Sequence, residues 1–247
     1  MLELLRQTIN SLKINGPKVT LKKIYLYFYV YIFEVRLHYT SSFLKKVTGV
    51  IHIGANEGQE RFEYAKHDLN VIWIEPIPMI FKKLAKNLEN FPKQKALNLL
   101  IASDDQAEYE FKVSNFDGGS SSIFDLAGHS EIWPSIHYVE SIKLQGHALS
   151  SVITNHKIDT ASYQALVMDV QGAELMVLFG AKKILKCFKY IKLEASDFEL
   201  YAGGCLLEDL TNYLNQNGFS IERQIKFAER SGKGNCYNVL YRNTMST

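Results

Sequence analysis

Short apolar runs and amphipathic stretches alternate along most of the chain. Apolar runs that are rich in β-branched residues and bounded by Gly or Pro are typical of strands buried on both faces of a sheet. Such runs lie at Val47–Gly54, Val71–Pro76, Ala96–Ala102, Ala165–Val170 and Tyr190–Ala195. Stretches that predict helices lie at Glu57–Lys66, Met79–Asn90, Ala173–Leu185 and Leu206–Asn217. This alternation predicts an α/β fold with a mostly parallel, twisted, doubly wound sheet.

Two regions depart from the alternation. Phe219–Phe227 and Asn235–Arg242 predict two strands that form an antiparallel hairpin at the edge of the sheet. Ala107–Ser114 and Tyr138–Gln145 alternate with period two, which predicts antiparallel strands of a β insertion at about 107–147, after the third strand. The Gly- and Ser-rich stretch between these two insertion strands is typical of a functional loop, and we expect it to form a lid on the substrate side.

Residues 1–46 differ from the rest in composition and are predicted to form a basic, aromatic segment that precedes a domain at 47–247. Residues 1–47 hold eight Lys and Arg against two Glu, whereas the whole chain has a net charge of only +2. The apolar run Ile24–Phe33 is shorter than the roughly 20 apolar residues that a membrane-spanning helix needs. Two interpretations stay open: the segment docks on the main domain, or residues 18–39 make a peripheral contact with an anionic membrane surface.

Composition and length constrain the setting of the protein. A chain of 247 residues fits one large domain with an appendage, and its small net charge does not favour nucleic acid as a partner. The three cysteines, Cys187, Cys205 and Cys236, are scattered and odd in number. This favours a reducing compartment. We therefore expect a cytoplasmic protein, peripheral at the inner membrane surface if the basic segment contacts lipid.

The turn after the first strand reads GANEGQE. Its Gly54 and Gly58 permit a tight turn, and Asn56 tolerates left-handed backbone. Glu57 and Glu60 would repel a pyrophosphate, and the third glycine of the dinucleotide fingerprint is absent. The turn therefore suits a ligand with an amino group and a sulfonium better than a dinucleotide.

A carboxylate also ends the second strand. Glu75 lies 21 residues after Gly54. Ligands of open α/β sheets bind at the carboxyl ends of the strands, where such a carboxylate can accept hydrogen bonds from both hydroxyls of a ribose. Capping of the following loop is the structural alternative. The position favours an adenosine ligand that lacks a 2′-phosphate.

With these residues in place, the chain resembles the FkbM-type methyltransferases from about Val47 to Arg242. The resemblance is carried by GANEGQE, by WIEPIP, by a third strand that ends in ASD, and by VMDVQGAELMVLFGA. The block Asp169–Glu174 is its most specific part. It implies a Rossmann-like class I methyltransferase fold and S-adenosyl-L-methionine as cofactor. It also implies methyl transfer to a hydroxyl, mostly of sugars or polyketides.

The resemblance also implies roles for single residues. The turn after the first strand would hold the cofactor, Glu75 its ribose, Ser103 and Asp104 its adenine, and Asp169 would lie near the methyl group. With the two acidic turn residues, the candidate cofactor-binding residues are Gly54, Ala55, Asn56, Glu57, Gly58, Glu60, Glu75, Pro76, Ala102, Ser103, Asp104 and Asp169. One position departs from the family, which commonly has Asp where this chain has His52. The loss of that charge puts the usual network around the methionine end of the cofactor in doubt.

Methylation of an alcohol calls for a general base, because a hydroxyl is a poor nucleophile. Asp169 is the first candidate, although it could equally accept a hydrogen bond from the cofactor or a loop. His137 and His129 are further candidates if the insertion folds over the site. Glu174 is explained by helix capping. Asp169, Glu174 and Glu194 could together hold a divalent cation through oxygen ligands, but we expect no metal site.

The sequence thus predicts an S-adenosylmethionine-dependent O-methyltransferase that acts on a hydroxyl of a sugar, glycan or glycolipid precursor. Two alternatives from other classes remain at this stage. One is an NAD-dependent oxidoreductase, which the acidic turn and the missing glycine disfavour. The other is a catalytically silent binding module that keeps the cofactor fold, an option that His52 keeps open.

Overall fold

The computed structural model describes residues 41–245 of the chain. The chain divides into two compact units, Met1–Phe43 and Leu44–Thr247. The predicted membrane contact of residues 18–39, and most of the predicted segment 1–46, lie outside the described residues. A short 3-10 helix, η1 (Ser42–Lys46), is the first described element. Between residues 41 and 245, no helix is long and apolar enough to cross a bilayer.

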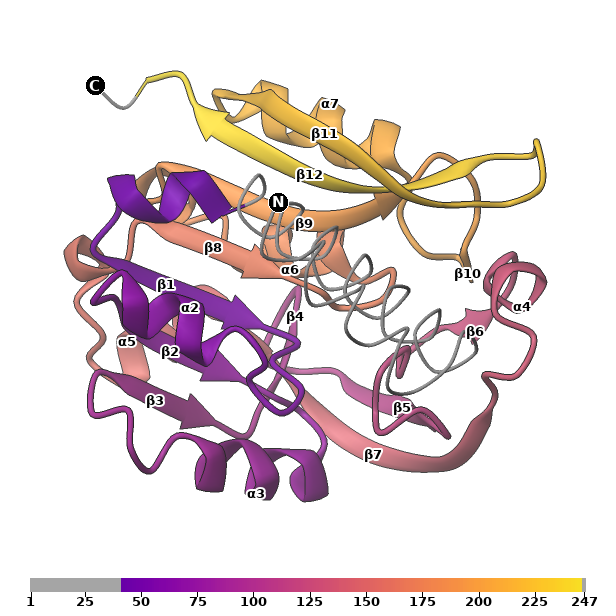
Figure 1. Ribbon diagram of the computed structural model, residues 1–247, viewed down its shortest axis with the longest axis horizontal. Helices are drawn as coiled ribbons and strands as arrows, with labels where there is room; N and C mark the ends of the chain where they lie inside the picture. The colour runs from indigo at the N-terminus through magenta and orange to yellow at the C-terminus, as the bar shows by residue number, and fades with distance from the viewer. Residues whose placement is uncertain (1–40, 246–247) are drawn as a thin grey trace, which may run out of the picture. The chain divides into compact units, whose positions relative to one another are not determined.

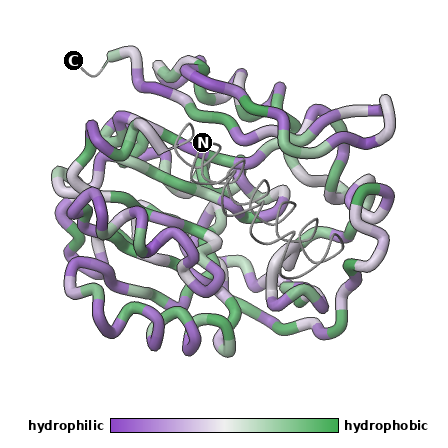
Figure 2. Tube along the Cα trace, viewed as in Figure 1, coloured by the Kyte–Doolittle hydropathy of each residue, from purple (hydrophilic) through white to green (hydrophobic). Residues whose placement is uncertain are grey.

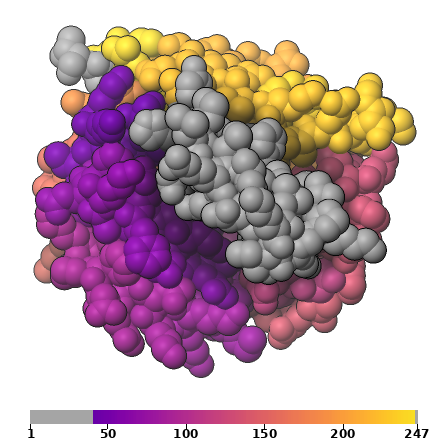
Figure 3. Space-filling model, viewed as in Figure 1, coloured from indigo at the N-terminus to yellow at the C-terminus, as the bar shows by residue number. Residues whose placement is uncertain are grey.

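A seven-stranded sheet with the order β11-β12-β9-β8-β1-β2-β3 forms the centre of the second unit (Figure 1). Its strands are β1 (Gly49–Ile53), β2 (Asn70–Ile74), β3 (Gln94–Leu97), β8 (Ala165–Met168), β9 (Tyr190–Ser196), β11 (Phe219–Glu229) and β12 (Asn235–Asn243). The strands from β3 to β9 pair in parallel. The antiparallel hairpin of β11 and β12 closes one edge, as predicted, and forms a continuous ridge there (Figure 3).

Helices cover both faces of this sheet. Two of them, α2 (Arg61–Lys66) and α3 (Pro78–Asn87), lie on one face (Figure 1). The opposite face carries α5 (Leu149–Asn155), α6 (Glu174–Gly180) and α7 (Leu207–Gln216), which contact one another in sequence. The sequence did not predict α5. The predicted helices at α2 and α6 were also too long. Turns occupy the residues before α2 and the residues after α6.

The third predicted strand, Ala96–Ala102, was wrong as one continuous strand, because the structure divides it into two. The chain forms β3 and then, after Asn98 and Leu99, the separate strand β4 (Leu100–Ala102). The side chain of Asn98 donates hydrogen bonds to the carbonyl oxygens of Glu75 (2.7 Å) and Pro76 (3.0 Å). This polar residue therefore ties the end of β2 to the point where the chain leaves the main sheet.

The predicted β insertion is present and continues from this break. Its long strand β7 (Tyr138–Ala148) pairs with β4 in parallel and with β5 (Glu108–Ser114) antiparallel, which makes a separate three-stranded sheet. The stretch between β5 and β7 also contains β6 (Asp125–Leu126) and the short helix α4 (His129–Ile132). A pair between β6 and β10 (Tyr201–Ala202) connects the insertion to the loop that follows β9.

Apolar side chains of the central strands form the main core. Ile51, Leu166 and Ile191, from three neighbouring strands, are fully buried against Leu178 and Leu210 of the helices. Figure 2 shows hydrophobic residues along these strands, whereas hydrophilic residues gather on the turns and on the outer side of α3. The core thus fixes the strands, and with them the positions of the residues that follow their carboxyl ends.

Candidate active site

The carboxyl ends of β1, β2 and β8 meet at one cavity. It contains about 720 Å³ of empty space, counting its open mouth. Its wall is formed by the turn after β1, the residues after β2 and β8, the crossover around β4, and the insertion.

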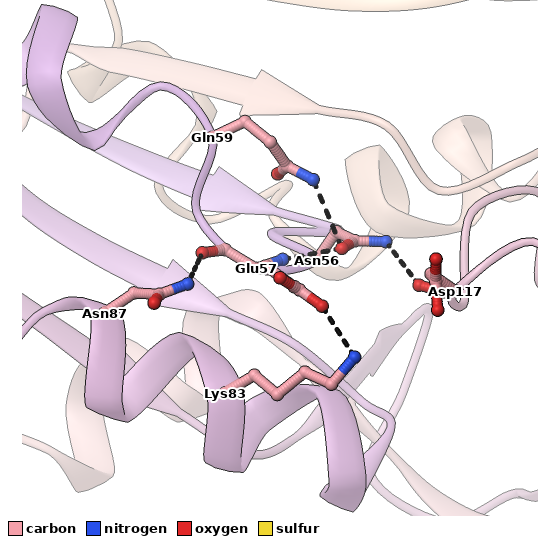
Figure 4. Close-up of polar contacts among 6 residues, drawn as sticks. All are labelled: Asn56, Glu57, Gln59, Lys83, Asn87 and Asp117. Carbon is pink, nitrogen blue, oxygen red and sulfur yellow. Dashed lines mark hydrogen bonds and ion pairs between the residues drawn. The ribbon is translucent and has the colours of Figure 1, made fainter.

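The turn after β1 lines the cavity through Gly54 and Asn56. Gly54 has φ +77°, and a Cβ atom there would lie 1.9 Å from the carbonyl oxygen of Asp169. Only glycine allows the ends of β1 and β8 to approach so closely. Asn56, at φ +46°, accepts the backbone N–H of Glu57 on Oδ1 (2.7 Å) and donates from Nδ2 to the carbonyl of Asp117 in the insertion (3.1 Å; Figure 4).

Neither of the two acidic residues of the turn lines the cavity. The carboxylate of Glu57 accepts a hydrogen bond from Lys83 of α3 (2.8 Å), and its carbonyl accepts one from Asn87 (2.9 Å; Figure 4). Glu60 directly precedes α2 and does not line the cavity. Nor do Ala55 and Gly58, whose backbone groups close the turn through a hydrogen bond of 2.9 Å.

Glu75 lies in the cavity wall and is only 4% exposed. Its two oxygens accept the backbone N–H groups of Asn56 (2.8 Å) and Ile77 (2.9 Å). Burial raises the pKa of this carboxyl to about 7. The two backbone hydrogen bonds act in the opposite direction but are outweighed by burial. Each oxygen keeps a lone pair that a ligand hydroxyl can use, so Glu75 suits a vicinal diol. Pro76 and Ala102 line the same cavity and give it apolar surface.

Ser103 and Asp104 do not line the cavity. Ser103 Oγ donates to Asp104 Oδ2 (3.0 Å), and Asp104 Oδ1 accepts the backbone N–H groups of Gln106 and Ala107. These hydrogen bonds lower the pKa of Asp104. In the structure the pair stabilises the turn between β4 and β5.

Asp169 follows β8 and lines the cavity beside Gly54. Gln171 Nε2 donates to its Oδ1, and its Oδ2 has no hydrogen bond within the described part of the chain. Burial raises the pKa of Asp169 to about 6, with a smaller contribution from the negative charge of Glu60. At neutral pH the group is therefore mostly ionised and more basic than an ordinary aspartate, which suits a general base.

The loop after Asp169 connects the site to the insertion. Gln171 has φ +54°, and its side chain accepts a hydrogen bond from the hydroxyl of Tyr201. Its carbonyl oxygen accepts one from Ser122 Oγ (2.7 Å). The insertion loop that ends at Ser122 also contributes Gly118–Ser121 to the cavity wall. It is thus attached on both sides of the cavity, to Asn56 and to Gln171.

The two candidate histidines lie differently. His129 is buried, its Nε2 lies 3.0 Å from the hydroxyl oxygen of Ser120, and Ser120 lines the cavity. Burial lowers the pKa of His129 to about 4, so the ring is neutral at pH 7. His137 is exposed and its ring lies 3.3 Å from the carbonyl oxygen of Ser135, outside the cavity wall.

His52 is a buried residue of β1 and does not line the cavity. Its Nδ1 lies 3.0 Å from the hydroxyl oxygen of Tyr64, and its ring stacks on Trp73 with 4.8 Å between centroids. Burial lowers the pKa of His52 to about 4. This histidine is therefore a neutral, hydrogen-bonded core residue.

Sequence reasoning missed several parts of the wall. Gln171 lies in the block that resembles the FkbM family, so its position was a usable signal. Ile77, Phe111 and Ser120 also line the cavity. They come from a proline-rich turn and from the insertion, where no sequence pattern marks them. Among the described residues, no group of three or more His, Cys, Asp or Glu side chains is arranged to hold a metal ion.

Comparisons with known proteins identify the class and then the family. The sheet order and the cavity at the strand ends are those of a class I methyltransferase that uses S-adenosylmethionine. The methyltransferase domain of METTL16 has the same fold, with a TM-score of 0.50 at 11% identity, covering 85% of this chain and 67% of that one. Residues 52–221 match the methyltransferase FkbM domain, and the chain belongs to that family.

Two further proteins are similar to this chain. The 2-O-methyltransferase NoeI of Sinorhizobium fredii (strain NBRC 101917 / NGR234) is 31% identical over 203 residues, which cover 79% of each chain. The structure of TrmK from M. capricolum in complex with S-adenosyl-homocysteine has a TM-score of 0.48 at 8% identity, over 84% of this chain and 67% of that one. The family membership confirms the prediction of a methyltransferase that uses S-adenosylmethionine. It favours this enzyme class over an NAD-dependent oxidoreductase or a silent binding module.

The cavity fits this cofactor. A buried carboxylate at the end of β2 suits the ribose, apolar residues such as Ile77 and Ile101 suit the adenine, and Asn56 supplies polar atoms beside the amino acid end.

Proposed function

We propose that the protein transfers the methyl group of S-adenosylmethionine to a hydroxyl of a sugar. The observation that carries this proposal is a pair of strand-end carboxylates in the wall of one cavity, the buried Glu75 and the half-buried Asp169. The similarity to a 2-O-methyltransferase supports an oxygen acceptor. A sugar also suits a cavity that carries carboxylate acceptors beside apolar surface.

Different residues of the cavity wall would have different roles in the reaction. Bound cofactor would supply a methyl group activated by a positively charged sulfur. Glu75 would accept hydrogen bonds from the ribose hydroxyls. Asp169 would accept the proton of the acceptor hydroxyl through its free Oδ2 as the oxygen gains the methyl group, a contribution worth roughly 10²–10⁴-fold in rate. The insertion loop Gly118–Ser121 would exclude water from the site.

Two variants separate cofactor binding from methyl transfer. Glu75→Ala should weaken the binding of S-adenosylhomocysteine about 10- to 100-fold, because hydrogen bonds to a charged group are lost. Asp169→Asn should bind S-adenosylhomocysteine nearly as well as the parent and lose methyl transfer by about 10²-fold or more. Isothermal titration measures the first effect, and labelled methyl transfer to a panel of glycosides measures the second.

The exposed Glu89, just after α3, gives a matched control. Glu89→Gln removes one carboxylate outside the cavity and should leave both readouts within about twofold, as is usual for surface substitutions. If Glu75→Ala binds S-adenosylhomocysteine as tightly as the parent, the ribose role of Glu75 is wrong. If the methyl group is recovered on nitrogen or carbon, the O-methyltransferase assignment is wrong.

A further inference from the structure

A chain of side-chain hydrogen bonds leads from Asp169 in the cavity wall into the insertion. Gln171 Nε2 donates to Asp169 Oδ1, and the hydroxyl of Tyr201 donates to Gln171 Oε1. The side chain of Ser120 makes a hydrogen bond with Tyr201, and its oxygen lies 3.0 Å from His129 Nε2. Five side chains thus connect the loop after β8 with β10 and with the insertion.

Asp169 sets the direction of this chain. An ionised carboxylate only accepts hydrogen bonds, so the amide of Gln171 must turn its nitrogen to Asp169 and its oxygen to Tyr201. Tyr201 therefore donates to Gln171 and accepts from Ser120, and Ser120 accepts from His129. This assigns the single N–H of the neutral histidine to Nε2. Its other nitrogen, Nδ1, has no hydrogen-bond partner among the described residues, and burial keeps the ring neutral by lowering its pKa to about 4.

Two residues of the chain have unfavourable backbone conformations. Gln171 has φ +54° and Ser120 has φ +63°, in the left-handed region that favours glycine. Residues held in such conformations gather at functional sites, where the surrounding structure fixes them. The hydroxyl of Ser122 does this for Gln171 by donating to its carbonyl oxygen (2.7 Å). Both positions thus keep a hydrogen-bonding side chain where glycine would relieve the strain.

The chain acts on Asp169 in two ways. It occupies Oδ1 and leaves Oδ2 for a ligand, which orients the carboxylate. The hydrogen bond from Gln171 also stabilises the ionised form, so it lowers the pKa of Asp169 against the larger, opposite effect of burial.

We propose that Gln171 and Tyr201 are positioning residues for methyl transfer, which hold the Asp169 carboxylate in one orientation with Oδ2 left for the acceptor hydroxyl. The proposal rests on the function proposed above, in which Asp169 takes the proton of that hydroxyl. Gln171 and Tyr201 act through Asp169 and not on the acceptor. Ser120 and His129 keep the hydroxyl of Tyr201 directed at Gln171.

Two variants of nearly unchanged size break the chain. Gln171→Met removes the donor to Asp169, and Tyr201→Phe removes the hydroxyl that holds Gln171. Each should lower kcat about tenfold or more for the best acceptor of the glycoside panel, measured with labelled S-adenosylmethionine and the full chain. Tyr201 does not line the cofactor cavity, so Tyr201→Phe should bind S-adenosylhomocysteine within about twofold of the parent, which also shows that it folds.

The pH profile of kcat separates positioning from a structural role. Loss of a hydrogen bond to the ionised carboxyl raises the pKa of Asp169, so the acidic limb should move up by about one pH unit in Gln171→Met. Tyr201→Phe should move it in the same direction by less. A merely structural role would lower the whole profile and leave the limb in place. The other charged groups that act on Asp169 are the same in every variant: Glu60, Glu75, Glu174, Glu194 and Lys192.

Tyr138 provides a matched control in the same insertion. Its hydroxyl donates to the carbonyl oxygen of Phe124 (2.7 Å) and is not part of the chain. Tyr138→Phe should therefore keep the parental kcat and acidic limb. A double variant gives the second control: added to Asp169→Asn, Tyr201→Phe should cost no further activity, because residues that act as a unit are not additive.

The outcomes distinguish this inference from the proposed function. The inference is overturned if Asp169→Asn loses activity but Gln171→Met keeps the parental kcat and acidic limb. It is also overturned by equal losses in Tyr138→Phe and Tyr201→Phe, or by a further loss in the double variant. In these cases the role of Asp169 as the base stands. Full activity of Asp169→Asn, or binding of S-adenosylhomocysteine without methylation of any glycoside, overturns both.

Discussion

A histidine in the middle of a buried strand is stable in its neutral form, because burial disfavours the charged imidazolium. His52 stacks on Trp73 and shares a hydrogen bond with Tyr64, and burial holds its pKa near 4. In the unfolded chain a histidine takes up its proton near pH 6.5. Acid therefore favours unfolding: the stability contribution is present above pH 6.5 and is lost as pH falls toward 4.

His52→Gln tests this role. At pH 7.5 the variant should be less stable than the wild type by about 1–2 kcal/mol, because Tyr64 loses its partner. Between pH 7.5 and pH 5.0 the wild type should lose about 2 kcal/mol relative to the variant, since only the wild type takes up a proton at this position on unfolding. Urea denaturation at the two pH values measures the gap. A gap that stays constant would contradict the buried, neutral state of His52.

Affinity for S-adenosylhomocysteine gives the second readout of the same variant. The ring of His52 does not line the cavity. His52→Gln should therefore leave the dissociation constant within about twofold of the parent. A large loss of affinity would mean that position 52 belongs to the cofactor network after all.

At the scale of elements, the insertion loop between β5 and β7 depends on few attachments. Ser122 is 1% exposed; its hydroxyl donates to the carbonyl of Gln171 (2.7 Å) and accepts the backbone N–H of Phe124 (3.0 Å). Ser122→Ala leaves both backbone groups unpaired and loosens the loop. We expect the affinity for S-adenosylhomocysteine to fall about 3- to 10-fold, the value of one to two net hydrogen bonds.

A serine elsewhere in the insertion provides the comparison. Ser141 of β7 donates its hydroxyl to the exposed carboxylate of Glu110 and does not line the cavity. Ser141→Ala should change the affinity by less than about twofold. If the two variants bind S-adenosylhomocysteine equally well, the loop does not form part of the cofactor site.

The elements also show what can be learned from a sequence of this kind. The parallel strands and the terminal hairpin were predictable because burial imposes a clear pattern on runs such as Ala165–Met168. The break at Asn98 was not, because it depends on side-chain hydrogen bonds to residues more than 20 positions away. The same holds for the site: Glu75 and Asp169 follow strands, whereas Glu57 was expected at the ligand and is oriented toward Lys83 of α3.

On the scale of the whole molecule, charge is distributed unevenly. The net charge is only +2. Yet four carboxyls gather at the carboxyl ends of the central strands, and their pKa values are all raised, chiefly by burial: Glu75, Asp169, Glu174 and Glu194. Without ligand, such groups favour folding most below their ordinary pKa, and this contribution is lost as pH rises through about 6 to 7. A cation bound among them would offset that loss.

The two forms of the cofactor differ in the charge that this environment senses. S-adenosylmethionine carries a positive sulfur and S-adenosylhomocysteine does not. As pH rises from 5.5 to 8, Glu75 and Asp169 lose their protons, and the site should attract the cation more strongly. The dissociation constant of S-adenosylhomocysteine divided by that of S-adenosylmethionine should increase about 3- to 10-fold over this range, corresponding to roughly 0.7–1.4 kcal/mol.

Asp169→Asn should flatten the increase, because it removes one of the titrating charges while keeping the side chain's size. Titration calorimetry of both ligands at four pH values gives the ratio directly, and a ratio that stays level or falls with pH would mean that the strand-end carboxyls do not face the sulfur.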